Sequence, residues 1–299
     1  MSDASYAQTT KAEGLDRRSM FSTIGAGAAS AVAIGALAAG GLTAATGPAE
    51  AQAIGDNDIL NFALNLEYLE AEYYIRAFTG QGLGSGDVTG LGTQGSVTGG
   101  SQVPFKSSAI QAYAQRLAVD EVTHVRFLRA VLGSAAVAEP SIEFTASFTN
   151  LAIAAGLIVA GQTFNPFADD VSFLLGAFVF EDVGVTAYNG AATLISNKSY
   201  LQAAASILAI EAYHAGSIRT LLANIGAGVA ANAISALRGR LGSGMEQGIL
   251  IPGLAYNAVA ADIESLAFRR TTAQVLPIVY GAPTGTGLFF PAGLNGLIR

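Results

Sequence analysis

The spacing of apolar and polar residues along the chain predicts a mainly helical protein. In four long stretches the apolar residues recur every three or four positions, as on a helix with one buried face. Polar residues that cap helices stand where each stretch begins, and Gly follows three of the four. Strand-like alternation is scarce. The predicted helices are Asp58–Thr79, Ser107–Leu132, Asp170–Ile195 and Ser199–Ile225, with a weaker fifth at Asp262–Val279.

The segments between these helices are unequal in length and composition. The segment Gly80–Val103 is rich in Gly, Ser and Thr, and we expect a surface loop there. The segment Ser134–Ala168 is long enough to cross a bundle and to hold a short helix near Ser147–Ile158. Gly226–Arg299 is expected to be irregular apart from the fifth helix. The pattern therefore predicts an all-α four-helix bundle with a long crossover between helices two and three, plus a C-terminal helix and an irregular extension.

The first 53 residues have the order of an export signal. The pair Arg17-Arg18 precedes an uncharged run rich in Ala and Gly from about Ile24 to Ala45, and Ala51-Gln52-Ala53 offers a small-x-small cleavage site. The paired arginines are typical of a twin-arginine signal. The alternative interpretation is an N-terminal membrane anchor. Residues 54–226 then form the bundle and residues 227–299 the extension. We expect an exported protein, in the periplasm, the cell envelope or outside the cell, with no membrane span in the mature chain.

Composition excludes several classes of function. Hydrophobic residues make up 51% and charged residues only 12%, which excludes a largely disordered chain. The net charge is -7, with 15 Lys and Arg and no basic cluster, so nucleic-acid binding is not expected. Cysteine is absent, which excludes disulfides, thiolate metal sites and iron–sulfur clusters. The low charge and high apolar content favour self-association as a homo-oligomer.

Both histidines of the chain stand three residues after a glutamate. One motif is Glu121-Val122-Thr123-His124 and the other is Glu211-Ala212-Tyr213-His214. On a helix this spacing places both side chains on the same face. With 12 Glu in 299 residues, one histidine has about a 4% chance of this spacing, so both share it by accident in about 0.2% of cases. The repeated motif therefore points to a site that uses both histidines.

Each of the four predicted core faces is interrupted by a glutamate near the middle of its helix. These residues are Glu67, Glu121, Glu181 and Glu211. Unpaired carboxylates gathered in one core repel each other and cost several kcal/mol to bury. No Lys or Arg lies on these faces, since Arg76, Arg126 and Arg219 are expected off them. Two divalent cations would balance four carboxylates, and this charge balance predicts a dinuclear metal site.

An internal repeat selects the ligand on the first helix among three glutamates. Tyr74 follows Glu67 by seven residues, as Tyr188 follows Glu181. Superposing the two segments places Glu70 against a glycine, which cannot be a ligand. We therefore choose Glu67, although Glu70 remains the alternative, as either a core acceptor or a surface residue.

Further residues near the predicted ligands have two open interpretations. Tyr74 and Tyr188 are either core residues with a hydrogen-bonded hydroxyl or partners of a ligand glutamate. Asp120 and Asp182 each neighbour a ligand glutamate. Asp120 either orients a histidine from the opposite helix or is a solvated surface charge. Glu72 is expected to be solvated.

Two helical runs are distinctive, LNFALNLEYLEAEYY at Leu60–Tyr74 and LGAFVFEDVGVTAY at Leu175–Tyr188, as are the tail segments Ala267–Leu276 and Phe289–Pro291. These segments resemble the ferritin-like family that includes the plant desiccation-related proteins and exported bacterial relatives. The resemblance covers nearly all of Asp56–Arg299. It implies a ferritin-like bundle in which the Glu-x-x-His glutamates bridge two metals and each histidine binds one. The implied ligands are Glu67, Glu121, His124, Glu181, Glu211 and His214.

The ligand types favour two iron or manganese ions, because zinc prefers fewer ligands and copper(I) prefers sulfur. The leading hypothesis is an exported redox enzyme that acts on oxygen or peroxide in stress protection, either by oxidising iron or by disproportionating peroxide. The alternative is a structural, desiccation-stress envelope protein whose metals only hold the bundle together. Iron storage in a cage is a weaker third hypothesis, because the long loops and tail would obstruct shell packing.

The signal hypothesis makes a direct prediction. N-terminal sequencing of the exported protein should begin near Ile54, because the export signal is removed after Ala53. A mature protein that begins at Ser2 would contradict the prediction.

Overall fold

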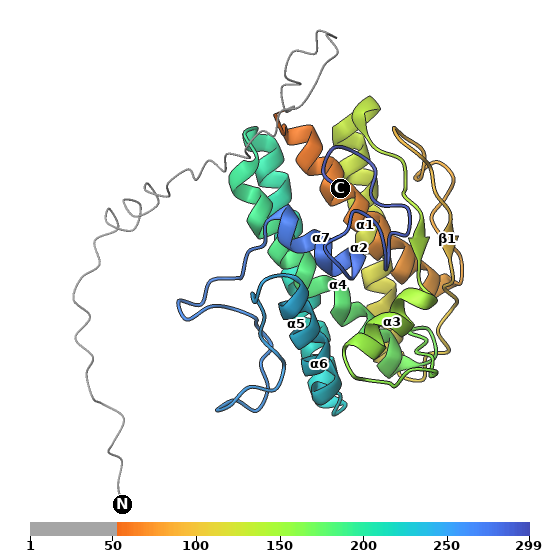
Figure 1. Ribbon diagram of the computed structural model, residues 1–299, viewed down its shortest axis with the longest axis vertical. Helices are drawn as coiled ribbons and strands as arrows, with labels where there is room; N and C mark the ends of the chain where they lie inside the picture. Colours follow the sequence, from red (N-terminus) through yellow and green to blue (C-terminus); the bar gives the residue numbers. More distant parts are fainter. Residues whose placement is uncertain (1–52) are drawn as a thin grey trace, which may run out of the picture. The chain divides into compact units, whose positions relative to one another are not determined.

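A computed structural model describes residues 53–299 (Figure 1). Almost the whole predicted signal segment, residues 1–53, lies outside the described residues, so export remains a prediction. Within the described range the chain is all-α apart from two very short strands, as predicted. The four long helices are α1 (Asp56–Thr79), α2 (Ser108–Leu132), α4 (Asp170–Ala191) and α5 (Lys198–Asn224).

Helices α2 and α4 begin, and α1 ends, at the local signals that predicted them, whereas α1 begins two residues earlier than predicted and α4 ends at Ala191 rather than Ile195. Ser107 caps α2 by accepting a hydrogen bond from the Ile110 amide, and Asp169 caps α4 by accepting one from the Ser172 amide. Gly80 ends α1 in a left-handed conformation with φ 78°, which favours glycine. These caps set where the helices begin or end. They thereby determine on which helical turn each cluster glutamate lies.

The long helices pack mainly as two pairs. Helix α1 packs along α2, and α4 packs along α5, while the contact between α1 and α4 is smaller. The crossover from α2 to α4 holds a 3-10 turn (Gly133–Ala135), strand β2 (Ile142–Glu143) and the predicted short helix as α3 (Ala146–Ala154). Strand β1 (Val97–Thr98), in the loop after α1, pairs in parallel with β2. The crossover therefore packs beside the loop that follows α1.

The C-terminal segment differs from the sequence-based expectation in two ways. Helix α6 (Gly228–Leu241) forms where irregular chain was expected, and α7 (Thr272–Tyr280) is shorter than the predicted Asp262–Val279. The Asp262 side chain accepts hydrogen bonds from the amides of Glu264 and Leu266, which forms a turn that competes with a helix. Both helices pack on α4, and Figure 1 shows α7 crossing the bundle.

Glu72 is buried, so the expectation of a solvated residue was wrong. Its carboxylate accepts a hydrogen bond from the Leu83 amide at 2.7 Å and pairs with Arg76 at 2.5 Å. The loop that begins at Gly80 folds back over α1 and covers it. Burial here depends on a loop whose path the helix periodicity does not encode.

Helix α4 is apolar enough to resemble a membrane span. Among the described residues, Asp170–Leu194 is the one helical stretch of sufficient length and hydropathy, and 89% of its most apolar part is buried in the protein. This burial is that of a core helix, because neighbouring helices cover it.

Three arginines that were not expected in the core form a buried ionic network beside α4. Arg219 on α5 lies off the glutamate face, as predicted, yet it is only 1% exposed because the C-terminal segment covers it. It donates to both oxygens of Asp182, at 2.9 and 2.8 Å, and Arg238 of α6 donates to the same carboxylate at 2.7 Å. Glu246 joins Arg238 to Arg270 at 3.0 and 2.8 Å. The network ties α4, α5, α6 and the segment before α7 together.

Asp182 is therefore neither solvated nor part of the glutamate cluster. Burial by itself would raise the pKa of its carboxyl, but Arg238 and Arg219 hold that pKa below its ordinary value. The two guanidinium groups also lie 4.4 and 5.4 Å from the centre of the Phe178 ring, within the range of cation–π attraction.

The network predicts a large effect for one substitution. Asp182→Asn removes the shared partner of two buried arginines, which should lower the free energy of unfolding by about 3–5 kcal/mol. The melting temperature should fall by on the order of 10 °C. The matched control is Asp87→Asn, which breaks an exposed pair with Arg126 and should cost less than about 1 kcal/mol. Equal melting of the two variants, measured by calorimetry, would contradict this prediction.

Candidate metal centre

The six side chains predicted as ligands come together in the middle of the bundle, and all six are buried. Glu67 comes from α1 and Glu181 from α4, while α2 and α5 each contribute a Glu-x-x-His pair. Their ligand atoms form two groups, and within each group the atoms lie within 4.8 Å of one another. The groups are Glu67, Glu121, His124 and Glu211, and Glu121, Glu181, Glu211 and His214. Glu121 and Glu211 belong to both groups, so the two groups overlap.

The two histidines direct Nδ1 toward the carboxylates. Nδ1 of His124 lies 2.9 Å from Glu121 and 3.2 Å from Glu67. Nδ1 of His214 lies 3.0 Å from Glu121 and 3.2 Å from Glu181. Each histidine thus contacts Glu121 and the glutamate of α1 or α4 on its own side, although Glu121 lies on the same helix as His124 and on the helix opposite His214.

Two tyrosines donate hydrogen bonds to cluster glutamates on the opposite helix. Tyr74 of α1 donates a hydrogen bond to Oε1 of Glu181 at 2.5 Å, and Tyr188 of α4 donates a short one to Oε1 of Glu67. Each hydroxyl leaves the other carboxylate oxygen directed at the cluster. Of the two interpretations, the structure supports partners that orient a cluster glutamate.

Asp120 orients a histidine from the opposite helix. Its Oδ2 lies 3.0 Å from Nε2 of His214, and Arg116 pairs with the same carboxylate at 2.5 Å. The Tyr113 hydroxyl donates to the backbone carbonyl of His214 at 3.0 Å. Tyr113 was not predicted, because nothing in the spacing of residues identifies a partner of a backbone group.

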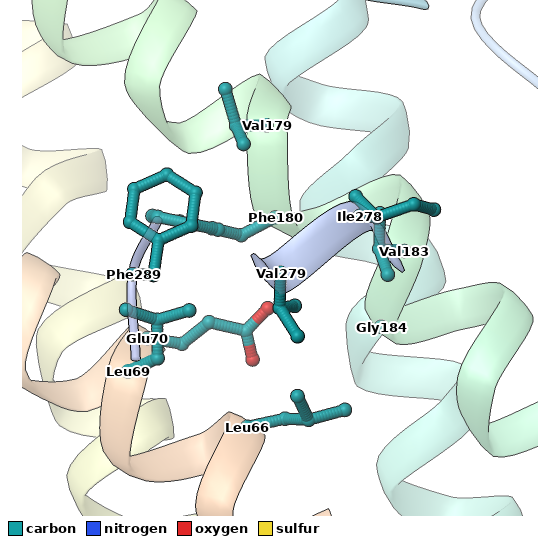
Figure 2. A pocket seen from close by; sticks show the side chains of 10 residues that line it. All are labelled: Leu66, Leu69, Glu70, Val179, Phe180, Val183, Gly184, Ile278, Val279 and Phe289. Atoms are coloured by element: carbon teal, nitrogen blue, oxygen red, sulfur yellow. The ribbon is translucent and has the colours of Figure 1, made fainter. Parts of the chain in front are cut away.

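Glu70 is buried but lies outside both groups, so the choice of Glu67 matches the geometry. Glu70 lines a small cavity between α1 and α4, and Figure 2 shows its carboxylate reaching toward Val279 of α7. Gly184 lines the same cavity, and a Cβ placed there would lie 2.2 Å from Oε2 of Glu211. A glycine is therefore required at this turn of α4 to leave room for the shared glutamate, which helix periodicity does not reveal.

The side chains by themselves leave the cluster electrostatically strained. Burial raises the pKa of Glu67 to about 7, and burial together with Glu70 and Glu121 raises the pKa of Glu211 well above its usual range. Burial would lower the pKa of each histidine, but Glu67 acts on His124 and raises its pKa to about 11. Glu181 likewise raises the pKa of His214 to about 12. The negative potential that raises the pKa of both histidines would also attract a cation.

The cluster also has polar atoms that the described side chains do not satisfy. Buried atoms without a hydrogen-bond partner include Oε2 of Glu67, Oε1 of Glu121, Oε2 of Glu181, both carboxylate oxygens of Glu211 and Nδ1 of His214. A buried polar atom normally has a partner, and one that lacks it costs about 1–3 kcal/mol. All of them except Oε2 of Glu211 lie within 3.8 Å of a histidine or carboxylate atom of the cluster. Carboxylate oxygens and imidazole nitrogens are metal ligands, so the residues fit a metal centre.

Comparison with known proteins agrees with the fold. The chain is 29% identical over 267 residues to a protein named ferritin-like catalase Nec2 from Nesocodon mauritianus, covering 81% of this chain and 84% of that protein. It is 31% identical over 244 residues to the desiccation-related protein PCC13-62 from Craterostigma plantagineum, covering 74% and 76%. No solved structure is significantly similar. The family model described as ferritin-like domain matches residues 55–224, which hold all six cluster residues, and the chain belongs to this ferritin-like family.

Proposed function

We propose that this protein is a ferritin-like enzyme that disproportionates peroxide at two iron or manganese ions. The observation that supports the proposal best is the pair of overlapping ligand groups that share Glu121 and Glu211. Two adjacent cations held this way would neutralise the gathered carboxylates and satisfy the buried oxygens. A hard set of carboxylate and imidazole ligands without thiolates suits iron and manganese.

The residues of the chain have separate tasks in this proposal. Glu67 and His124 would hold one ion, Glu181 and His214 would hold the other, and the two shared glutamates would bridge them. The pair of ions would supply the capacity to exchange two electrons with a peroxide. Tyr74, Tyr188 and Asp120 keep the ligands in place through the hydrogen bonds described above.

Peroxide is favoured over iron as the substrate by one comparison, since a relative similar over most of both chains is named a catalase. The export expected from the first 53 residues would place the protein in the periplasm, the cell envelope or outside the cell. Removal of peroxide there would serve stress protection. Self-association as a homo-oligomer stays a prediction.

A structural role for the metals is the second candidate. The cluster lies in the centre of the bundle, where cations would bind all four long helices together, and the other relative is named for desiccation. In this alternative the metals stabilise the protein and peroxide is not consumed. The two candidates agree on metal binding and differ in turnover.

Metal binding should change the stability of the protein in a pH-dependent way. A titratable group whose pKa is raised in the folded state stabilises that state at pH values below its ordinary pKa. This contribution is lost as the pH rises through the raised pKa. Glu67, with its pKa raised to about 7, and both histidines, with theirs above 10, act in this direction. The melting temperature of metal-free protein should therefore fall between about pH 5 and pH 8, by on the order of 10 °C. Metal-loaded protein should not follow this fall, because its ligands bind as deprotonated groups.

Glu211→Gln is the variant for this experiment, measured by calorimetry with and without Mn²⁺. It removes a shared ligand and a carboxyl that is costly to bury. The metal-free variant should melt at or above metal-free wild type at pH 8, and Mn²⁺ should no longer raise its melting temperature. Glu139→Gln is the matched control, since Glu139 is a buried glutamate outside the cluster whose pKa burial raises to about 8. If metal-free and loaded wild type melt together, the proposed metal centre is wrong.

Turnover separates the enzyme from the structural candidate. Loaded wild type should release oxygen from hydrogen peroxide, measured with an oxygen electrode against metal content by elemental analysis. Tyr188→Phe should keep both ions and lose about tenfold in kcat, because Glu67 loses its orienting hydrogen bond. Protein that holds two ions per chain and releases no oxygen would support the structural role instead.

A further inference from the structure

The seam between α1 and α4 and the seam between α2 and α5 are two sides from which a molecule could approach the proposed metal centre. The seam between α1 and α4 is covered by α7 and the C-terminal segment. Ile278 and Val279 of α7, together with Phe289, line the cavity left there, and its volume is only about 20 Å³ (Figure 2). That volume holds about one water molecule. This seam is closed by apolar side chains.

The seam between α2 and α5 contains a groove of about 460 Å³. His124 lies at its inner wall and is 8% exposed, whereas the shared glutamates behind it are fully buried. Nδ1 of His124 faces the carboxylates, and within residues 53–299 no hydrogen bond is formed by its Nε2. The groove therefore reaches a cluster residue from outside.

The internal repeat accounts for the difference between the surroundings of the two histidines. Aligning Glu121 with Glu211 places Asp120 against Ile210, the residue that precedes the second motif. The Asp120 carboxylate lies 3.0 Å from Nε2 of His214, whereas Ile210 lines the groove next to His124. One histidine is thus closed off by a carboxylate and the other is left accessible. The pseudo-symmetric centre has one open side.

The groove wall is uncharged apart from the neighbouring imidazole. Its polar side chains are Thr123, Ser199, Gln202 and Ser206, and its larger apolar ones include Phe127 and Ile210. The groove wall has no carboxylate that would attract a hydrated ferrous ion, and no Lys or Arg that would attract an anion. A neutral molecule with hydroxyl groups can exchange its water contacts for these hydroxyl and amide groups.

The geometry points to this groove as the entrance and binding site for the substrate of the metal centre. Its ligand is a neutral peroxide, and the groove has room for an alkyl hydroperoxide because its volume is many times the roughly 30 Å³ of a water molecule. The inference rests on the proposed function for the identity of the substrate. The position of the entrance rests only on the groove, the accessible histidine and the closed opposite seam.

Footprinting with hydroxyl radicals, which are small and neutral, tests the entrance without relying on turnover. The full-length protein is used as purified, and oxidation of individual residues is read by peptide mass spectrometry. His124 should be oxidised several-fold faster than His214. Ala203→Phe and Ser206→Phe fill the groove from α5 and should each protect His124 several-fold. The matched control is Ala205→Phe, at an exposed position of α5 outside the groove, which should not protect it.

Oxygen release by the metal-loaded protein tests the substrate class. Ala203→Phe should lower kcat/KM for hydrogen peroxide by about tenfold at unchanged metal content, and Ala205→Phe should leave it unchanged. In wild type, tert-butyl hydroperoxide should compete with hydrogen peroxide. Absence of that competition would overturn the assignment of alkyl hydroperoxides to the groove.

The outcomes separate the entrance from the proposed function. Protection of His124 in a loaded protein that releases no oxygen would support the entrance and contradict the function. Oxygen release that is insensitive to Ala203→Phe and Ser206→Phe would support the function and overturn the entrance. Equal oxidation of His124 in all variants would also overturn it.

Discussion

Compensation of buried negative charge is the constraint on which this structure depends. The described core contains the cluster glutamates, Glu70 and Asp182, and each needs a partner because burial penalises a free carboxylate. Two adjacent residues of α4 find different partners. Glu181 faces the histidines and carboxylates of the cluster, whereas Asp182, about 100° further around the helix, faces Arg219 and Arg238. Within one turn, α4 thus faces a cluster with excess negative charge on one side and a network with excess positive charge on another.

Two-fold repetition organises the cluster, and its breaks determine what the two sides can do. Glu67 with Tyr74 mirrors Glu181 with Tyr188, and the Glu-x-x-His motifs mirror each other. The symmetry fails where Asp120 is replaced by Ile210. On one side a carboxylate holds a histidine in place, and on the other a groove adjoins the equivalent histidine. Two ions in such a centre would have similar ligands and different access.

The C-terminal segment, outside the residues matched by the family model, completes the core of the bundle. It supplies Arg238, Glu246 and Arg270 to the ionic network and covers the seam between α1 and α4 with α7. Because one seam is closed, water has limited access to the buried carboxylates. The lower dielectric constant of a site with little water strengthens electrostatic interactions at the cluster, including those that would hold cations.

The sequence by itself determined the four long helices, the crossover helix and the six residues that converge. It could do so because helix periodicity is local, and because an apolar face interrupted by Glu-x-x-His specifies which side chains enter the core. Only the tertiary structure decided the burial of Glu72, the network around Asp182, the formation of α6 and the open side at His124. These features depend on loops and C-terminal chain that fold over helices distant in sequence. Whether a helix face is covered by another segment or exposed depends on how the whole chain packs. The spacing of residues within one helix contains no information about that packing.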